Sequence, residues 1–329
     1  MNVLLIGGAG YIGSQVVRDI LREKKNKPVV LDNLSTGHAA SLPASVPLVR
    51  GSYGNRTLVV KTLKQYKIES VLHFGARSLV RESLQKPKEY WKANVEDSLY
   101  LLEAMREVGV KHILLSSTAA VYGCPQHNVI TEQHSTKPIS PYGKTKLVLE
   151  NQIAVFAQKH GFHGVALRYF NVAGADGSGR IGEDHNPETH LIPNVLRHAA
   201  GQTPFISLWG NNYPTPDGTC IRDYVDVRDV SRAYLLLLRN RTKSGKTWAS
   251  YNLGSGQGYS NGQVIQTACE VTGKPLTVHS MPRRSGDPAK LVASVAKIKR
   301  DFGWQPEYTL EDMIRSAWKW HNTHPDGYH

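Results

Sequence analysis

Short, almost wholly apolar runs alternate with amphipathic stretches through the first half of this 329-residue chain, and this alternation limits the fold more than any other feature. Six such runs predict strands: 3–6, 29–32, 46–49, 70–74, 112–117 and 164–170. Because these runs are continuous rather than alternating, both faces of the sheet are expected to be buried, as in a parallel sheet. Apolar residues at helical spacing separate the runs. We therefore predict an α/β fold with a Rossmann-like, doubly wound parallel sheet.

The local amino-acid composition of the chain changes at about residue 172. Gly, Pro, Asn and Asp become frequent, as in "NVAGADGSGRIGEDHNPE" and "WGNNYPTPDGT", and the helical patterns between them are shorter. We predict a Rossmann-like domain over 1–171, to which 222–255 returns. The remainder of 172–329 is predicted to form mainly a smaller, loop-rich α/β region at the C-terminus.

Composition argues against nucleic-acid-binding, disulfide-linked, zinc-binding, exported and membrane proteins, to different degrees. The formal charge of +13 keeps nucleic-acid binding open, but the basic residues are scattered, which favours a solvated surface with an anionic small ligand. Cys124, Cys220 and Cys269 lie far apart and form no C-x-x-C pair, which argues against disulfides or a zinc site and fits a reducing cytoplasm. No export signal or run of about 20 apolar residues is present. We expect a soluble, cytoplasmic protein without a bound metal, nucleic acid or membrane.

The segment "VLLIGGAGYIGSQVVRDIL" places Gly7, Gly10 and Gly13 between an apolar strand and an amphipathic helix. Glycines permit a tight turn there, and the helix N-terminus then faces a phosphate. Asp32 ends the next predicted strand, where an acid binds the ribose hydroxyls and disfavours a 2′-phosphate. The alternative is a glycine-rich turn with an unrelated aspartate. Spacing, context and acid together favour NAD over NADP.

The stretch "SPYGKTK" places Tyr142 and Lys146 four residues apart, on one face of a helix if the stretch is helical. A free tyrosine has a pKa of about 10, too high for an efficient base at neutral pH. A neighbouring lysine, with the positive nicotinamide ring, would lower that pKa and make the tyrosine a base. The pair alone is common by chance and is more typical of a packed tyrosine beside a surface lysine. Its position after the hydroxyl-rich strand end "SSTAAVYG" favours catalysis.

With these motifs in this order, the chain resembles the extended short-chain dehydrogenase/reductase family, and within it the UDP-glucose 4-epimerase group. The resemblance extends over nearly the whole chain and includes "LDNLSTG", "VLHFGARSLVRES", "LRYFNVAGA", "YNLGSG", "PRRSGDPAKLVAS" and "WKWHNTHPDGY". It implies a homodimeric isomerase that interconverts UDP-glucose and UDP-galactose. In such enzymes the O4 proton is removed, the C4 hydride passes to NAD, and the hydride returns to the opposite face of a 4-keto sugar. The domain over 1–171 would then bind NAD, and the region over 172–329 the UDP-sugar.

The resemblance also implies roles for individual residues. Tyr142 matches the proton acceptor, Lys146 the ribose-binding lysine that lowers the tyrosine's pKa, and Thr118 the hydroxyl that contacts O4. The implied cofactor-binding residues are Gly7, Gly10, Tyr11, Ile12, Gly13, Asp32, Asn33, Ser35, Gly37, Ser52, Tyr53, Phe74, Gly75, Ala76, Ser78, Asn94, Ser116, Tyr142, Lys146 and Tyr169. The implied substrate-binding residues are Thr118, Tyr142, Asn171, His190, Leu191, Trp209, Arg222, Tyr224, Arg284, Asp287 and Leu291. Arg222 and Arg284 would bind the phosphates, since arginine binds phosphate in a bidentate manner.

A few positions depart from the pattern of the group. Ser52–Tyr53 replaces the acid and aliphatic pair that recognises adenine, and Ser78 replaces a lysine of some members. Leu291 lies at the position that limits sugar size and is intermediate between an excluding tyrosine and a permissive small residue. Epimerases of UDP-N-acetylglucosamine, UDP-glucuronate or UDP-xylose therefore stay open as alternatives, as does a non-catalytic NAD-binding regulator. Dehydratases and decarboxylases of this fold carry acidic residues just after the Thr/Ser, where this chain has Ala119 and Ala120. The two alanines therefore argue against those two activities.

Overall fold

The computed structural model describes residues 1–125, 127, 129–241, 247–284 and 287–328. Its contacts divide the chain into two compact units. The first unit contains Met1–Gly123, Gln133–Tyr169 and Ser231–Tyr251, and the second contains Cys124–Glu132, Phe170–Val230 and Asn252–His329. The segment that returns to the first unit is thus 231–251, and 124–132 joins the second unit although it lies within 1–171.

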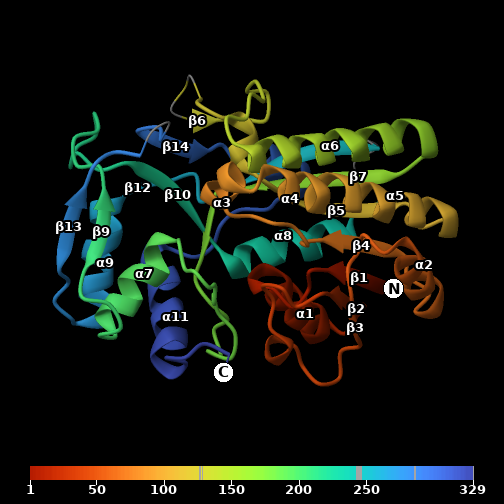
Figure 1. Ribbon diagram of the computed structural model, residues 1–329, viewed down its shortest axis with the longest axis horizontal. Coiled ribbons are helices and arrows are strands. Elements are labelled where there is room, and N and C mark those ends of the chain that lie inside the picture. The colour runs from red at the N-terminus through yellow and green to blue at the C-terminus, as the bar shows by residue number, and fades with distance from the viewer. Residues whose placement is uncertain (126, 128, 242–246, 285–286, 329) are drawn as a thin grey trace. The chain divides into compact units, whose positions relative to one another are not determined.

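A seven-stranded sheet forms the centre of the first unit, in the order β11-β7-β5-β4-β1-β2-β3 (Figure 1). Its strands are β1 (Asn2–Ile6), β2 (Lys27–Asp32), β3 (Leu48–Arg50), β4 (Ser70–His73), β5 (His112–Thr118), β7 (His163–Tyr169) and β11 (Trp248–Leu253). All the pairings from β7 to β3 are parallel. The six predicted strands are present, and the predicted Rossmann-like fold is confirmed.

Helices cover this sheet. They are α1 (Tyr11–Glu23), α2 (Arg56–Gln65), α3 (Val80–Gln85), α4 (Pro87–Trp91), α5 (Asp97–Val108), α6 (Pro141–His160) and α8 (Val227–Arg239), with the short turns η1 (Ala39–Ser41), η2 (Lys92–Glu96) and η3 (Ala119–Tyr122). Leu101, Leu102 and Met105 of α5 are fully buried against strand residues such as Leu4 and Ile113. The helical spacing seen in the sequence therefore marks the faces that pack on the sheet.

Local signals fix where α6 begins and ends. The Ser140 hydroxyl accepts a hydrogen bond from the Gly143 amide (3.1 Å), and Pro141 occupies the first turn. Both residues are favoured at these positions, because the cap satisfies a free amide and proline has none to satisfy. At the other end Gly161 takes the left-handed conformation that terminates a helix. Tyr142 is consequently the second residue of the helix.

The second unit is built around β10 (Ile221–Asp226), which pairs with three other strands. Its strands also include β6 (Val129–Ile130), β8 (Asn171–Ala173), β12 (Gly258–Ser260) and β14 (Lys290–Ala293), and a separate parallel pair of β9 (Ile206–Trp209) and β13 (Val278–Met281). Its helices are α7 (Leu191–Ala199), α9 (Asn261–Thr272), α10 (Ala296–Phe302) and α11 (Leu310–Thr323). Buried side chains from α7, α9 and α11 form its core.

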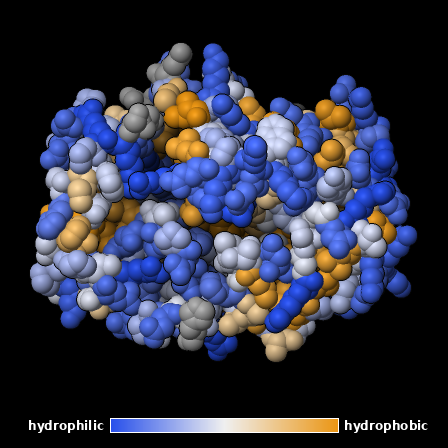
Figure 2. Space-filling model, viewed as in Figure 1, coloured by the Kyte–Doolittle hydropathy of each residue, from blue (hydrophilic) through white to orange (hydrophobic). Residues whose placement is uncertain are grey.

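On the face shown in Figure 2, hydrophilic residues cover most of the area and hydrophobic residues emerge in small groups. Of the helices that the structure describes, none combines the length and the apolar character needed to cross a membrane.

Candidate active site

The predicted cofactor and catalytic residues of the first unit gather at the carboxyl ends of its parallel strands. Gly7 follows β1 directly, Asp32 ends β2, Phe74 follows β4, Thr118 ends β5 and Tyr169 ends β7. Parallel strands place these ends along one edge of the sheet, where ligands bind in open α/β folds. The edge is thus assembled from motifs that lie far apart in the sequence.

The glycine loop has the close backbone approaches that only glycine permits. Gly7 has φ +71°, and a Cβ there would lie 2.6 Å from the amide nitrogen of Gly75. A Cβ at Gly13 would lie 2.5 Å from the carbonyl oxygen of Gly7, so that glycine brings α1 close to the loop. Gly10 is the N-cap of α1, and a Cβ at this position would have only the Gly7 carbonyl oxygen near it, at 3.4 Å. Gly10 provides no side-chain cap, so the amides of the first turn of α1 are available to a bound group.

Asp32 connects this loop to the segment after β2. One carboxylate oxygen accepts a hydrogen bond from the Ala9 amide (2.9 Å), and the other accepts one from the Leu34 amide (2.8 Å). Asn33 and Ser35 lie exposed in that segment, and Gly37 packs against the Asp32 carboxylate. The buried acid is thus fixed beside the helix N-terminus, as ribose binding requires.

These residues fit a bound dinucleotide. The glycine cradle, the uncapped first turn of α1 and the strand-end acid are the three elements that hold a pyrophosphate and a ribose. Tyr11 and Ile12 begin α1 itself, half-buried beside the cradle. These residues are therefore suited to hold a dinucleotide, and their individual contacts with NAD stay predictions.

Thr118, Tyr142 and Lys146 lie together at the end of β5. The Tyr142 hydroxyl hydrogen-bonds the Thr118 side chain, whose oxygen also accepts the Ala120 amide (3.1 Å). Lys146, one turn along α6, donates from Nζ to the carbonyl oxygen of Ser116 (2.8 Å). The structure thus brings the three predicted catalytic residues together.

Burial dominates the electrostatics of this group in the protein alone. Burial raises the pKa of Tyr142 to about 12, and the hydrogen bond with Thr118 offsets only part of that effect. Burial also lowers the pKa of Lys146 to about 8, against the attraction of Glu150. In the protein alone, desolvation is thus the largest influence on this pKa, and its lowering by Lys146 together with a bound nicotinamide stays a prediction.

Sequence reasoning missed a buried ion pair behind these residues. Arg168 of β7 holds both carboxylate oxygens of Glu150 (3.0 and 2.6 Å), and the Ser117 hydroxyl donates to the same carboxylate (2.5 Å). Arg168 also donates to the Tyr122 hydroxyl (2.9 Å). The available signal was an acid four residues beyond Lys146, on the buried face of α6.

Several other predicted cofactor residues form internal contacts at this edge. Asn94 lies in the π-helical turn η2 and hydrogen-bonds the backbone of Arg77 (2.9 Å each way) and the Thr145 hydroxyl (3.1 Å). It thereby joins the loop of Gly75, Ala76 and exposed Ser78 to α6. Tyr169 hydrogen-bonds Tyr234, whose ring lies 4.7 Å from that of Phe74.

Ser52 and Tyr53 take up local contacts after β3. The Ser52 hydroxyl accepts the Gly54 amide (3.1 Å), and the Tyr53 hydroxyl donates to the Ala93 carbonyl (2.6 Å). The Tyr53 ring also packs against His73, with centroids 5.0 Å apart. These contacts give Tyr53 a packing role, and adenine recognition by this pair stays a prediction.

In the second unit, predicted substrate residues cluster around β10. Tyr224 pairs with Asn171 of β8, and Arg222 pairs with Leu291 of β14. The Arg222 guanidinium forms an ion pair with Asp287. Each pairing joins residues more than fifty positions apart in the sequence.

Four further residues predicted to bind substrate lie at a strand end, in a loop or at a helix start of the second unit. The Arg284 guanidinium lies 4.9 Å from the centroid of the Trp209 ring at the end of β9. His190 is the N-cap of α7 and Leu191 its first residue. These placements leave the roles of the four side chains in nucleotide binding as predictions.

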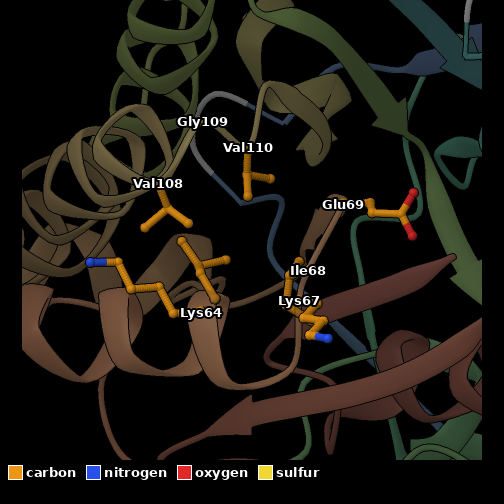
Figure 3. Close-up of a pocket in the computed structure, with 8 residues that line it drawn as sticks. Lys64, Lys67, Ile68, Glu69, Val108, Gly109 and Val110 are labelled. Atoms are coloured by element: carbon orange, nitrogen blue, oxygen red, sulfur yellow. The ribbon is translucent and has the colours of Figure 1, made fainter.

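A hollow of 520 Å³ lies elsewhere in the first unit (Figure 3). Its lining residues are Leu63, Lys64, Lys67, Ile68, Glu69, Val108, Gly109 and Val110. These residues end α2 and α5 and lead into the amino ends of β4 and β5, and Glu69 points away from Val108 and Val110. The hollow is therefore at the opposite sheet edge from the candidate site and contains none of its residues.

Comparison with known proteins decides the family. A sequence profile for the NAD dependent epimerase/dehydratase family matches residues 3–254. The chain belongs to this family. The family is described as NAD dependent, in agreement with the cofactor predicted from the glycine loop and Asp32. The match covers all but the first two residues of the first unit and continues into the second.

Individual members of the family resemble the chain over its full length. The UDP-glucose 4-epimerase of Lactobacillus helveticus is 45% identical over 329 residues, 100% of this chain and 99% of that protein. A crystal structure of a UDP-glucose 4-epimerase has a TM-score of 0.97 at 43% identity, with 100% of both chains covered. The Bifidobacterium longum UDP-glucose 4-epimerase in complex with NAD+ and UDP has a TM-score of 0.94 at 34% identity, over 99% of this chain and 100% of that one. The predicted resemblance to this group is confirmed.

Proposed function

We propose that this chain is an NAD-dependent isomerase that interconverts UDP-glucose and UDP-galactose. The observation that carries the proposal is the hydrogen bond between Tyr142 and Thr118 at the carboxyl end of β5, with Lys146 one turn away. UDP-glucose 4-epimerase is also the activity named for the Lactobacillus helveticus relative and for the solved structure that match this chain over its full length. Identity at this level with complete coverage supports a shared reaction as well as a shared fold.

The residues of the first unit would perform the proton transfer. Tyr142 Oη would take the proton of the sugar's O4 hydroxyl, and the Thr118 hydroxyl would hold O4 in line for that transfer. Bound NAD would accept the C4 hydride and return it, so the reaction has no net redox change. Lys146 would bind the nicotinamide ribose. Since burial raises the pKa of Tyr142 to about 12, proton removal depends on added positive charge beside the phenol.

The second unit supplies the groups suited to the UDP moiety. Arg222 and Arg284 are cations near which a diphosphate would bind, and Trp209 offers an aromatic face for uracil. Asp287 would bind a ribose, which requires that its ion pair with Arg222 opens or is shared when phosphate arrives. Asn171, Tyr224, His190 and Leu191 would complete the contacts with the nucleotide sugar.

The test is to incubate the purified protein with UDP-glucose or with UDP-galactose, without added cofactor. The measurement is the rate at which each sugar nucleotide is converted into the other. We expect co-purified NAD and activity in both directions. Tyr142→Phe should lower kcat by about 10²- to 10⁴-fold, the usual contribution of a general base. Tyr66→Phe, at the end of α2, is the matched control and should turn over normally. Near-normal kcat in a folded, NAD-loaded Tyr142→Phe protein would contradict the assignment.

We also propose that the chain forms a homodimer through α5 and α6. Tyr100 of α5 and Val155 of α6 are large apolar side chains that are more than two-fifths exposed, and the two helices pack on each other. Burial of such side chains between copies is favourable. Light scattering should give twice the mass of one chain, and Tyr100→Lys combined with Val155→Lys should give one chain mass.

A cytoplasmic location is the final part of the proposal. Cys124 and Cys269 are exposed and form no disulfide, as is typical of a protein kept in a reducing compartment. Fractionation of the source cells should recover the protein with cytoplasmic markers, and its recovery from an oxidising compartment would contradict this location.

A further inference from the structure

Four side chains of the segment before α7 converge on one point of the second unit. Glu183, His185, Glu188 and His190 each direct one carboxylate oxygen or imidazole nitrogen into the cluster, and these atoms all lie within 4.8 Å of one another. Nothing in the proposed epimerase chemistry uses Glu183, His185 or Glu188. The cluster therefore calls for an explanation of its own.

The separations match those of ligands around one small metal ion. Oε1 of Glu183 is 3.2 Å from Nδ1 of His185 and also contacts Nδ1 of His190. The Glu188 carboxylate is 3.5 Å from Nδ1 of His190 and 3.8 Å from Nδ1 of His185. Tetrahedral zinc, with bonds of about 2.0–2.1 Å, holds its ligand atoms about 3.3 Å apart. Only small movements of the side chains would centre an ion among them.

Burial supplies a second, independent sign. The side chains of Glu183 and Glu188 are 5% and 1% exposed. Oε2 of Glu188 is buried and has no hydrogen-bond partner among the residues that the structure describes. A buried carboxylate oxygen without a partner is costly, because its lost hydration is not replaced. The Glu188 carboxylate thus points into the cluster with a free coordination position.

The charges of the cluster also favour a cation. The carboxylates of Glu183 and Glu188 and the imidazoles of His185 and His190 place their polar atoms within 4.8 Å of one another. A divalent cation at the centre of the cluster would neutralise both buried carboxylates.

We propose that Glu183, His185, Glu188 and His190 bind one zinc ion, which fixes the segment leading into α7. Two imidazole nitrogens and two carboxylate oxygens suit zinc, whereas calcium and magnesium take oxygen ligands. Four protein ligands leave no open position, so the ion would be structural rather than catalytic. This site departs from the expectation of a metal-free protein, which considered cysteine spacing alone. His190 would bind through Nδ1, which leaves Nε2 for the nucleotide contact predicted from the sequence.

The test is zinc binding by the full-length protein after treatment with a chelator. Titration with zinc sulfate against a chromophoric chelator should show one tight equivalent per chain. Cobalt(II) in place of zinc should give the intense visible absorption of a tetrahedral site, a readout that is independent of epimerase activity. Glu188→Gln keeps the size of the side chain but removes its charge, and His185→Ala removes one ligand. Each should weaken binding by at least about 10- to 100-fold.

His163→Ala, an exposed histidine of the first unit, is the matched control and should bind zinc as the unaltered chain does. If the unaltered chain binds no zinc, or binds it no more tightly than Glu188→Gln, the proposal is overturned. If His185→Ala does not fold, the Glu188→Gln titration and the cobalt spectrum still decide. An octahedral cobalt spectrum that is equal in all variants would also overturn it, because it would indicate adventitious surface binding.

Discussion

Lys146 donates a hydrogen bond from its ammonium nitrogen to the main-chain oxygen of Ser116, 2.8 Å away. Lys146 is 1% exposed, so this bond joins the second turn of α6 to the carboxyl-terminal part of β5 inside the protein. Burial lowers the pKa of the ammonium to about 8. Lys146 is therefore charged at neutral pH and loses its charge just above it.

The first prediction concerns that charge. NAD affinity should fall as pH rises from 7 to 9, because Lys146 becomes neutral across its pKa of about 8. Lys146→Met should bind NAD about 10- to 100-fold more weakly at pH 7, the loss typical of a charged hydrogen bond, and should show little pH dependence. Calorimetric titration at the two pH values measures both effects. Lys144→Met, exposed on the same helix, should keep the pH dependence of the unaltered chain.

The second prediction separates backbone strain from steric contact in the glycine loop. Gly7 and Gly109 have similar φ values, +71° and +84°, so alanine at either position carries the same strain of about 1–2 kcal/mol. Only at Gly7 would the new Cβ meet backbone, 2.6 Å from the Gly75 nitrogen, whereas nothing lies within 4 Å at Gly109. Gly7→Ala should therefore lose NAD binding and stability, and Gly109→Ala should lose a little stability alone. Equal NAD binding by the two variants would exclude a role for that close approach.

Local sequence patterns predicted the strands and helix start that form this site. Contacts between residues far apart in the sequence could not be predicted. The apolar runs located six strands, and the proline after Ser140 marked where α6 begins, because both depend on neighbours in the sequence. The pairing of Glu150 with Arg168 and that of Asn94 with Arg77 depend on which strands and helices become neighbours. No periodicity records such contacts. The raised pKa of Tyr142 also depends on the depth of burial, which the motif Tyr-x-x-x-Lys does not specify.

The third prediction concerns the buried ion pair behind the site. Glu150→Gln leaves the Arg168 guanidinium buried without a counter-charge, and we expect the free energy of unfolding to fall by about 3–5 kcal/mol. Glu107→Gln breaks the exposed ion pair with Arg56 and should change the free energy of unfolding by less than about 1 kcal/mol. Urea denaturation of both variants provides the comparison. Equal losses would show that burial of the Glu150 pair has no special effect.

The fourth prediction is acid sensitivity from a buried histidine. His112 is hydrogen-bonded to Ser70 (2.6 Å), and burial, with nearby Arg241, lowers its pKa to about 3. The unfolded chain then binds more protons than the folded one between pH 6.5 and 3, so stability is complete above pH 6.5 and falls as pH decreases through this range. We expect about 1–2 kcal/mol of loss from this residue between pH 7.5 and 5.

His112→Gln cannot take up that proton, so its unfolding free energy should change less over the same pH interval. Ser70→Ala, which removes the hydrogen bond but keeps the buried imidazole, is the comparison and should retain the acid sensitivity. If His112→Gln and the unaltered chain lose the same free energy between pH 7.5 and 5, the loss originates elsewhere.

The fifth prediction tests how Leu291 limits the sugar. Leu291 pairs with Arg222 in neighbouring strands, so a larger side chain there would reduce the space beside a predicted phosphate-binding arginine. Leu291→Tyr should lower turnover of UDP-N-acetylglucosamine relative to UDP-glucose, and Leu291→Ala should raise that ratio. Rates with UDP-glucose serve as the internal control in each variant. An unchanged ratio in both variants would remove Leu291 from the determinants of specificity.

The register of α6 has a consequence for sequence length. Tyr142, Lys146 and Glu150 follow one another at intervals of four residues, and each contacts β5 or β7. One residue inserted between 142 and 150 would turn the later part of the helix by about 100° and carry Glu150 away from Arg168. Substitutions on the exposed side of this segment leave that register intact. An insertion or deletion between 142 and 150 is therefore expected to disrupt the site, whereas substitutions at exposed positions of the same segment are expected to be tolerated.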